Sequence, residues 1–303
     1  MKKVLVTGAT GFIGRHVLKL LQNRGQYEIH AASLDALDIA YPKVHWYQVD
    51  LLNSCQAEQL IKNVRPELLM HFAWYAVPGQ YWTSDQNLFW EKSSIELIKG
   101  FYENGGKRLV GVGTCAEYSW DSSVLAEDKT PLKPATIYGQ SKSRVGSFLT
   151  ECSRKLGVSS AWGRIFFLYG PYENAHRLVP SVICSLLQNQ PALCTHGEQI
   201  RDFLYVQDVA AAFVALLESS VEGPVNIASG QPVALKEIIM KIADKLGRRQ
   251  LVRLGALAGQ VNDPEVLEAD VKKLSEKVGW HPDFSLDAGL ELTINWWKKA
   301  LHV

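Results

Sequence analysis

The fold is decided by residues 4–14, which read Val4-Leu5-Val6-Thr7-Gly8-Ala9-Thr10-Gly11-Phe12-Ile13-Gly14. A short apolar run predicts a buried strand, and the amphipathic segment 12–24 predicts a helix after it. In such a turn the first glycine allows the tight bend, the second lets the backbone approach a pyrophosphate, and the third lets the helix pack on the strand. The helix N-terminus then presents free N–H groups to phosphate. This arrangement predicts a dinucleotide site, and an ordinary strand–helix turn is the alternative.

The first half of the chain alternates short apolar runs with amphipathic stretches, which is typical of a parallel sheet covered by helices. We expect further strands at residues 29–32, 44–49, 68–73, 108–112 and 159–165, and further helices at residues 87–104 and 136–156. The predicted fold class is α/β, a Rossmann-type doubly wound parallel sheet with a smaller mixed C-terminal substrate domain.

Prolines become frequent after residue 170, and the expected elements become shorter there. We therefore expect residues 1–170 to form the NAD(P)-binding Rossmann domain, with later returns around residues 200–220. Residues 171–303 are expected to form mainly the substrate-binding cap.

The composition excludes several classes of protein. The 303 residues carry 32 Lys+Arg against 31 Asp+Glu, which predicts neither a nucleic-acid nor a membrane-surface partner. The longest apolar run, residues 209–217, is too short to span a bilayer. The 5 cysteines are scattered and odd in number, which argues against disulfides and a zinc site and favours a cytoplasmic location. No metal site is predicted.

Tyr138 and Lys142 form a Y-x-x-x-K pair. Residues four apart share one helix face, so a phenol and an ammonium can meet at one substrate. A free tyrosine is a poor acid–base group at neutral pH, and a nearby cation lowers its pKa toward the working range. The spacing also occurs by chance, so the pair indicates a catalytic site only together with the other motifs of the chain.

These motifs together resemble the extended short-chain dehydrogenase/reductase family, which includes nucleotide-sugar epimerases, dehydratases and ketoreductases. The resemblance extends along nearly the whole chain. Asp50-Leu51 is similar to the pair that this family places against adenine, and His71-Phe72-Ala73 is similar to its H-x-A element beside the cofactor. The implied cofactor-binding residues are Gly8, Gly11, Phe12, Ile13, Gly14, Arg15, Ser33, Asp50, Leu51, Ala73, Tyr138 and Lys142.

The choice between NAD and NADP depends on the end of the second expected strand. A carboxylate there would bind a free ribose hydroxyl, whereas an arginine would accommodate a 2′-phosphate. The chain has Ser33-Leu34-Asp35 at this point. Asp35 is one candidate for the ribose, and Ser33 with Arg15 is the candidate pair for a phosphate. We favour NADP over NAD.

Thr114 is the third catalytic candidate beside Tyr138 and Lys142. It follows an expected strand, at the carboxyl edge where open α/β sheets bind ligands. The resemblance implies that its hydroxyl orients the reacting oxygen and shares its developing charge. A turn-forming threonine is the alternative. The adjacent Cys115 is interpreted as a small apolar filler rather than a nucleophile.

The resemblance also implies substrate-binding residues. Arg201, in an R-D-F element, is expected to pair with a substrate diphosphate, although a surface salt bridge would use it equally. Arg177 is a second phosphate candidate. Tyr81 lies in an aromatic group that would either stack on the substrate or cover the core, formed with Trp74, Tyr75 and Trp82.

Departures from the family pattern bear on the reaction. Family dehydratases place an Asp-Glu pair where this chain has Cys115 and Ala116. Glu117 is one residue late and, on an alternating strand end, would point elsewhere. Trp90 stands where an asparagine is common, with Asn87 one turn away, and Phe167 replaces another asparagine. Dehydration is therefore disfavoured, and the usual epimerase contacts to the sugar are altered.

We therefore expect an NAD(P)-dependent oxidoreductase acting on a nucleotide-diphosphate sugar, with a 4-keto-6-deoxy sugar reductase favoured. A nucleotide-sugar 4-epimerase is the alternative within this class. Remoter alternatives are a reductase of a non-sugar ketone and a cofactor-sensing binding protein. The resemblance further implies a homodimer formed through the helices that flank the fifth strand.

Overall fold

Seven parallel strands form the large sheet of the computed structural model, which describes residues 1–34, 41, 43–259 and 263–303. The strand order is β11-β7-β5-β4-β1-β2-β3, and every neighbouring pair is parallel. The bounds are β1 (Lys2–Thr7), β2 (Tyr27–Ser33), β3 (Val44–Gln48), β4 (Leu68–His71), β5 (Arg108–Thr114), β7 (Ser159–Ile165) and β11 (Gly223–Ile227). The order reverses between β1 and β4, the point where such sheets bind dinucleotides.

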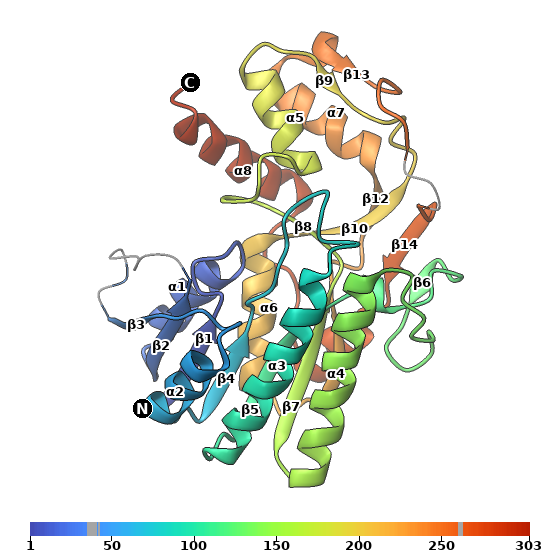
Figure 1. Cartoon of the computed structure of the whole chain (residues 1–303). Helices are drawn as coiled ribbons and strands as arrows, with labels where there is room; N and C mark the ends of the chain where they lie inside the picture. The colour runs from blue at the N-terminus through green and yellow to red at the C-terminus, as the bar shows by residue number, and fades with distance from the viewer. Residues whose placement is uncertain (35–40, 42, 260–262) are drawn as a thin grey trace.

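Helices cover both faces of this sheet (Figure 1). In β1, Val4 and Val6 pack in one apolar cluster with α1 (Gly14–Arg24) and α6 (Val206–Glu218). The intervening Leu5 packs in a second cluster on the opposite face, because side chains alternate along a strand. The helices on that second face are α2 (Ser54–Val64), α3 (Gln86–Glu103) and α4 (Ile137–Leu156).

A smaller sheet and three helices form the other end of the molecule (Figure 1). Its strand order is β12-β10-β14-β6, and β8 also pairs with β10. The strands are β6 (Val124–Leu125), β8 (Phe167–Tyr169), β10 (Ile200–Tyr205), β12 (Pro232–Ala234) and β14 (Val266–Ala269), and a separate pair is β9 (Ala192–Leu193) with β13 (Val252–Arg253). The helices are α5 (Leu178–Leu187), α7 (Leu235–Leu246) and α8 (Leu286–Ala300), which share one apolar cluster.

The predicted fold class is confirmed, while some element bounds differ. The fourth strand ends at His71 rather than at residue 73, and the first helix begins at Gly14 rather than at residue 12. Helix α2 was not predicted, although Asn53 caps it by accepting from the Gln56 N–H at 3.2 Å. Segments of both halves interleave, since β6 joins the smaller sheet and β11 the larger one. The division into 1–170 and 171–303 stays a prediction.

Membrane spans, disulfides and metal clusters are absent from the described residues. None of their helices is long and apolar enough to cross a bilayer. All 5 cysteines are free thiols. Within the same described ranges, no group of three or more His, Cys, Asp or Glu side chains could hold a metal ion.

Arg108 at the start of β5 ties the sheet to α6. Its buried guanidinium donates to the carbonyls of Leu216 at 2.7 Å, Leu217 at 3.1 Å and Val221 at 2.8 Å. Leu216 and Leu217 lie in the last turn of α6, whose carbonyls have no partner within the helix, and Val221 follows it; the Leu216 carbonyl also accepts from the Ser219 hydroxyl at 3.0 Å. One side chain therefore satisfies three acceptors in the core.

Replacing Arg108 with leucine should lower the free energy of unfolding by about 2–4 kcal/mol, because buried carbonyls would lose their donors. Urea unfolding measures this change. The matched control is Lys107→Gln, which breaks an exposed ion pair with Glu67 and should cost less than about 1 kcal/mol. Equal losses in the two variants would contradict this role of Arg108.

Candidate active site

The turn between β1 and α1 has no room for side chains at two of its glycines. Gly8 has a φ of +64°, and a Cβ there would lie 2.7 Å from the Ala73 nitrogen. A Cβ at Gly14 would lie 2.2 Å from the Gly8 carbonyl oxygen. Gly11 differs, because it is exposed, and a Cβ there would lie 3.0 Å from the Gly8 carbonyl oxygen alone. The turn thus packs tightly against the end of β4 and exposes Gly11 to solvent.

The N-terminus of α1 is suited to bind an anion. Ile13 occupies the N-cap position and supplies no side-chain hydrogen bond, and the first turn of the helix has no acidic residue. The helix dipole and its first N–H groups therefore favour a negative charge at this point. Together with the open surface at Gly11, the cradle fits the pyrophosphate of a dinucleotide.

Ser33 and Arg15 both reach Thr10 in this turn. The Ser33 hydroxyl lies 2.7 Å from the Thr10 hydroxyl, and Arg15 donates to the Thr10 carbonyl through Nε at 3.2 Å and a terminal nitrogen at 2.5 Å. The Arg15 guanidinium also lies 4.1 Å from the centre of the Tyr172 ring. The structure thus gathers the predicted phosphate pair beside the glycine turn. Asp35, the other ribose candidate, lies outside the described residues.

Asp50 and Leu51 follow β3 and lead into α2. The Asp50 carboxylate accepts from the Leu52 N–H at 2.9 Å, which closes a local turn. Leu51 is buried, and its carbonyl accepts from the Ser93 hydroxyl of α3 at 2.5 Å. This turn is therefore anchored to a neighbouring helix.

The three predicted catalytic residues come together at the carboxyl end of β5. Thr114 is the last residue of β5, and its side chain lies beside the Tyr138 phenol. Lys142 lies one turn later on α4 and donates to the Val112 carbonyl at 3.0 Å. Because Val112 is two residues before Thr114 on the same strand, β5 positions both the hydroxyl and the ammonium.

Burial changes the acid–base properties of this pair. It raises the pKa of Tyr138 above its ordinary value, an effect that the Thr114 side chain opposes. Burial lowers the pKa of Lys142 to about 7, while the negative charge of Glu117 acts in the opposite direction. In the protein alone, the phenol is therefore protonated at neutral pH, and the ammonium is close to its titration point.

Glu117 corrects one expectation. It does not lie on a strand end, because residues Cys115–Glu117 form a 3₁₀ turn. Its carboxylate accepts from the Thr114 N–H at 2.8 Å, from the Trp162 indole at 2.9 Å and from Arg164 Nε at 2.8 Å. Thr114-x-x-Glu117 is a capping box, a sequence signal that would have predicted this turn. Glu117 thus holds the backbone of Thr114 in place.

Cys115 is an unreactive neighbour of Thr114. It is buried in an apolar cluster with Tyr118 and Leu125. Burial raises the pKa of its thiol to about 12, so the nucleophilic thiolate is scarce at neutral pH. This agrees with its interpretation as a filler.

Aromatic side chains surround the Tyr138 phenol. The rings of Tyr81 and Trp82 meet it edge-on at 4.8 Å and 5.7 Å between centroids. Arg177 lies 5.0 Å from the centre of the Tyr81 ring and donates to its hydroxyl at 3.4 Å. The sequence alone left open whether this aromatic group covers the core or the site, and the structure places Tyr81 and Trp82 beside Tyr138.

Arg201 lies in a different environment from the one expected. It is buried and donates to the Asp263 carboxylate at 2.6 Å and to the Pro264 and Ile200 carbonyls at 2.7 Å and 2.8 Å. The structure thus shows an ion pair, which was the alternative expected for Arg201, although Arg201 is buried and not on the surface. The contact with a substrate diphosphate stays a prediction. Any anion that binds Arg201 would therefore share it with Asp263, a partner that sequence reasoning missed.

The fold is a Rossmann-like α/β fold, and it brings the predicted residues Thr114, Tyr138 and Lys142 to one edge of the large sheet, as the resemblance to the extended short-chain dehydrogenase/reductase family implies. The model of the NAD dependent epimerase/dehydratase family matches residues 4–228, and the chain belongs to this family.

Curated relatives of known activity cover almost the whole chain. UDP-glucuronate 4-epimerase from Thermodesulfobacterium geofontis is 26% identical over 99% of this chain and 97% of its own length. dTDP-4-dehydro-6-deoxyglucose reductase from Escherichia coli is 25% identical over 96% of both chains.

Solved structures agree with the fold. UDP-glucose 4-epimerase from Thermotoga maritima, in complex with UDP-glucose, superposes with a TM-score of 0.88 at 23% identity over 99% of both chains. MoeE5 in complex with UDP-glucuronic acid and NAD superposes with a TM-score of 0.85 at 26% identity, over 98% of this chain and 99% of its own.

His71 connects the site to the fold. Its ring is buried at the end of β4, with Nδ1 2.7 Å from the Thr7 hydroxyl and Nε2 2.9 Å from the Ser94 hydroxyl. Burial, and then the charge of Lys142, lower the pKa of His71 to about 3. The folded protein therefore keeps this ring neutral, whereas the unfolded chain protonates it near pH 6.5.

We expect this difference to destabilise the protein in acid. Between pH 6.5 and 3 the unfolded state binds one more proton at His71, so stability is complete above this window and falls as the pH falls through it. The loss at pH 5 is about 2 kcal/mol from this residue. Urea unfolding at pH 7.5 and pH 5 should show a fall that is larger in the wild type than in His71→Asn by about this amount. Equal falls would show that His71 does not titrate on unfolding.

Proposed function

We propose that this enzyme is an NAD(P)-dependent oxidoreductase acting on a nucleotide-diphosphate sugar, and that it reduces a 4-keto-6-deoxy sugar. The supporting observation is the contact of Thr114 with Tyr138, with Lys142 one turn later, at the sheet edge that also carries the glycine cradle. The activities of the curated relatives support a nucleotide-sugar substrate.

Thr114, Tyr138 and Lys142, the catalytic trio, each have a distinct part in this chemistry. The bound dinucleotide would supply a hydride donor or acceptor. Tyr138 exchanges a proton with the sugar oxygen, and Thr114 orients that oxygen through its hydroxyl. Lys142 binds the ribose next to the nicotinamide and lowers the pKa of the phenol by its charge.

The choice between reaction types rests on which carboxylates are present. Cys115 and Ala116 stand where family dehydratases have their Asp-Glu pair, and both oxygens of Glu117 accept from protein donors. The site therefore has no free carboxylate on this turn for moving protons at other sugar carbons. A 4-epimerase uses the same three residues as a reductase and is the alternative; relatives with this activity support it.

For the cofactor we favour NADP over NAD. β2 ends at Ser33, and Arg15 lies beside it across Thr10, whereas Asp35, the candidate for a free ribose, lies outside the described residues. A guanidinium and a hydroxyl are donors for a 2′-phosphate. NAD, the cofactor named for MoeE5, is the alternative.

For the substrate anion we propose Arg177 and Arg201. Arg177 is the nearer to the trio, since it touches Tyr81, whose ring meets Tyr138. Arg201 would pair with the diphosphate while keeping its contact with Asp263.

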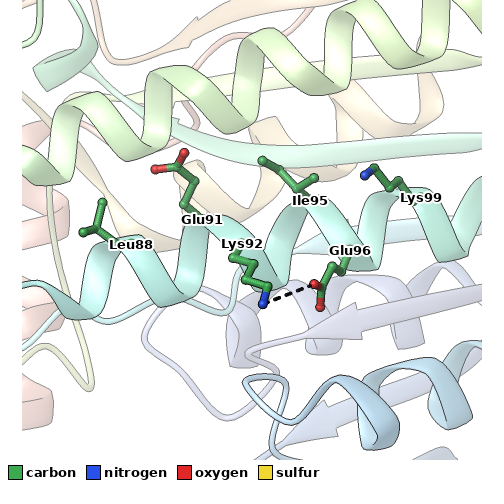
Figure 2. Close-up of a pocket in the computed structure, with 6 residues that line it drawn as sticks. All are labelled: Leu88, Glu91, Lys92, Ile95, Glu96 and Lys99. Carbon is green, nitrogen blue, oxygen red and sulfur yellow. Dashed lines mark ion pairs between the residues drawn. The ribbon is translucent and has the colours of Figure 1, made fainter.

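We further propose a homodimer in which the outer face of α3 contacts the partner copy. This face carries the exposed side chains of Leu88 and Phe89, with 47% and 58% of their surface accessible. A hollow of about 380 Å³ lies along the same helix. Figure 2 shows residues that line it, among them the ion pair of Lys92 with Glu96. Exposed apolar side chains among balanced charges fit a contact between protein copies better than a nucleic-acid or membrane surface.

Tyr138→Phe tests the catalytic assignment. It should reduce kcat by about 100- to 10,000-fold, because the proton of the reacting oxygen loses its partner. Cofactor affinity, measured by fluorescence titration, should stay within a factor of about three of the wild type. The control Tyr27→Phe, at the start of β2 and away from the glycine turn, removes a hydroxyl bonded to Glu218 and should leave turnover unchanged. Turnover close to normal in Tyr138→Phe would rule out this assignment.

Product analysis distinguishes the reductase from its alternatives. With a nucleoside-diphosphate 4-keto-6-deoxyhexose, a reductase should oxidise one NADPH for each sugar reduced, as followed by absorbance and mass spectrometry. Interconversion of 4-epimers without net cofactor consumption would instead establish the epimerase. Equal activity on the sugar without its nucleotide would contradict a nucleotide-sugar substrate, because binding energy from the nucleotide should contribute to turnover.

A further inference from the structure

The ammonium group of Lys142 has an unusual environment for a buried charge. The side chain is 4% exposed, and its one hydrogen bond within the described residues goes to the Val112 carbonyl at 3.0 Å. The centre of the Trp74 ring lies 3.8 Å from Nζ, and the centre of the Trp162 ring lies 6.0 Å away. No carboxylate of the described ranges is within ion-pair distance of this group. After the Val112 carbonyl, the indole face of Trp74 is therefore the nearest electron-rich group that the structure places at this ammonium.

The charged and titratable groups near Lys142 do not provide the anion that would normally stabilise a buried ammonium. Glu117 favours the ammonium, but Arg164 pairs with Glu117 at 2.8 Å and offsets its charge. His71 is neutral at physiological pH, and the Tyr138 phenol is protonated in the protein alone. A cation over the face of an indole is attracted by the negative potential of the ring, most strongly where water is excluded.

The Trp74 ring is held in position by Asn87. Its indole nitrogen donates to the Asn87 side-chain oxygen at 3.0 Å. Asn87 is fully buried and in turn donates to the Tyr81 and Ser84 carbonyls at 2.7 Å and 2.8 Å. One amide therefore fixes both the indole over Lys142 and the loop that carries Tyr81 against Tyr138. The sequence comparison had singled out Asn87 without giving it a role.

We propose that Trp74 is a positioning residue that holds Lys142 in its ammonium form through the face of its indole ring, with Asn87 fixing the plane of that ring. The function of this charge rests on the proposed role of Lys142 beside Tyr138. The contact between the Trp74 ring and the Lys142 ammonium does not depend on that role. Because the pKa of Lys142 is lowered to about 7 by burial, a small change in the stability of the cation changes its charge at neutral pH.

The direct test is a titration of Lys142 in the full-length, cofactor-free protein. Lysine labelled with ¹³C at Cε reports ionisation through its chemical shift, and Lys142→Met identifies the signal. Trp74→Leu removes the π face, and we expect the pKa of Lys142 to fall by about 0.5 to 1.5 units. Trp74→Phe keeps an aromatic face and should restore most of this difference. The matched control is Trp90→Leu, a ring 6.4 Å from Trp74, which should leave the titration unchanged.

A wild-type titration in Trp74→Leu would overturn the proposal, and so would equal shifts in the leucine and phenylalanine variants. Should Trp74→Leu fail to fold, replacement of the 9 tryptophans by fluorinated tryptophan keeps their shape and weakens the ring potential. The pKa of Lys142 should then fall in a folded protein, and no change would again overturn the proposal. None of these readouts needs turnover, so a failure of the proposed reaction would be seen separately.

Discussion

A side chain at Gly8 or Gly14 would collide with the backbone of Ala73 or of Gly8 itself, and the arrangement of the site follows from this constraint. Because the turn lies directly against the end of β4, the N-terminus of α1 opens at the point where the strand order reverses. β5 is the next strand beyond β4, so its last residue, Thr114, ends at the same edge. The close packing of one turn thus sets the separation between the glycine turn and the Thr114 hydroxyl.

Behind Thr114 the protein buries charges instead of apolar side chains. Glu117 and Arg164 form an ion pair at 2.8 Å, and Arg164 also donates to the Tyr118 hydroxyl at 3.0 Å. Such a pair returns little net stability, because desolvation opposes the Coulomb attraction. The ion pair instead fixes the position of Glu117, whose carboxylate also accepts from the Thr114 N–H and the Trp162 indole. A satisfied buried network of this kind keeps Thr114 in one conformation, as a residue that orients a reacting atom requires.

Most of what could be predicted from the sequence came from patterns within short segments of the chain. The glycine turn, the strands of the large sheet and the Tyr138–Lys142 pair follow from spacings within a few residues, and helix periodicity is enough to place the pair on one face. Contacts distant in sequence were not predictable. Arg201 meets Asp263 62 residues later, and Trp74 reaches Lys142 from a different element. Polar side chains on loops have several possible partners, and only the folded chain selects one.

The aromatic groups around Tyr138 bear on the choice between reduction and epimerisation. An epimerase must return the hydride to the opposite face of the sugar, so the keto intermediate has to turn over within the site. A reductase needs a single orientation. Tyr81 and Trp82 pack on each other at 4.6 Å and both meet Tyr138 edge-on, and Trp120 meets Trp82 at 6.5 Å. Rings that support one another lose little further freedom on binding a ligand, and their rigid surface favours one orientation of the substrate. A rigid aromatic surface beside Tyr138 is what the proposed reductase would need, and a 4-epimerase with the same three residues is the alternative.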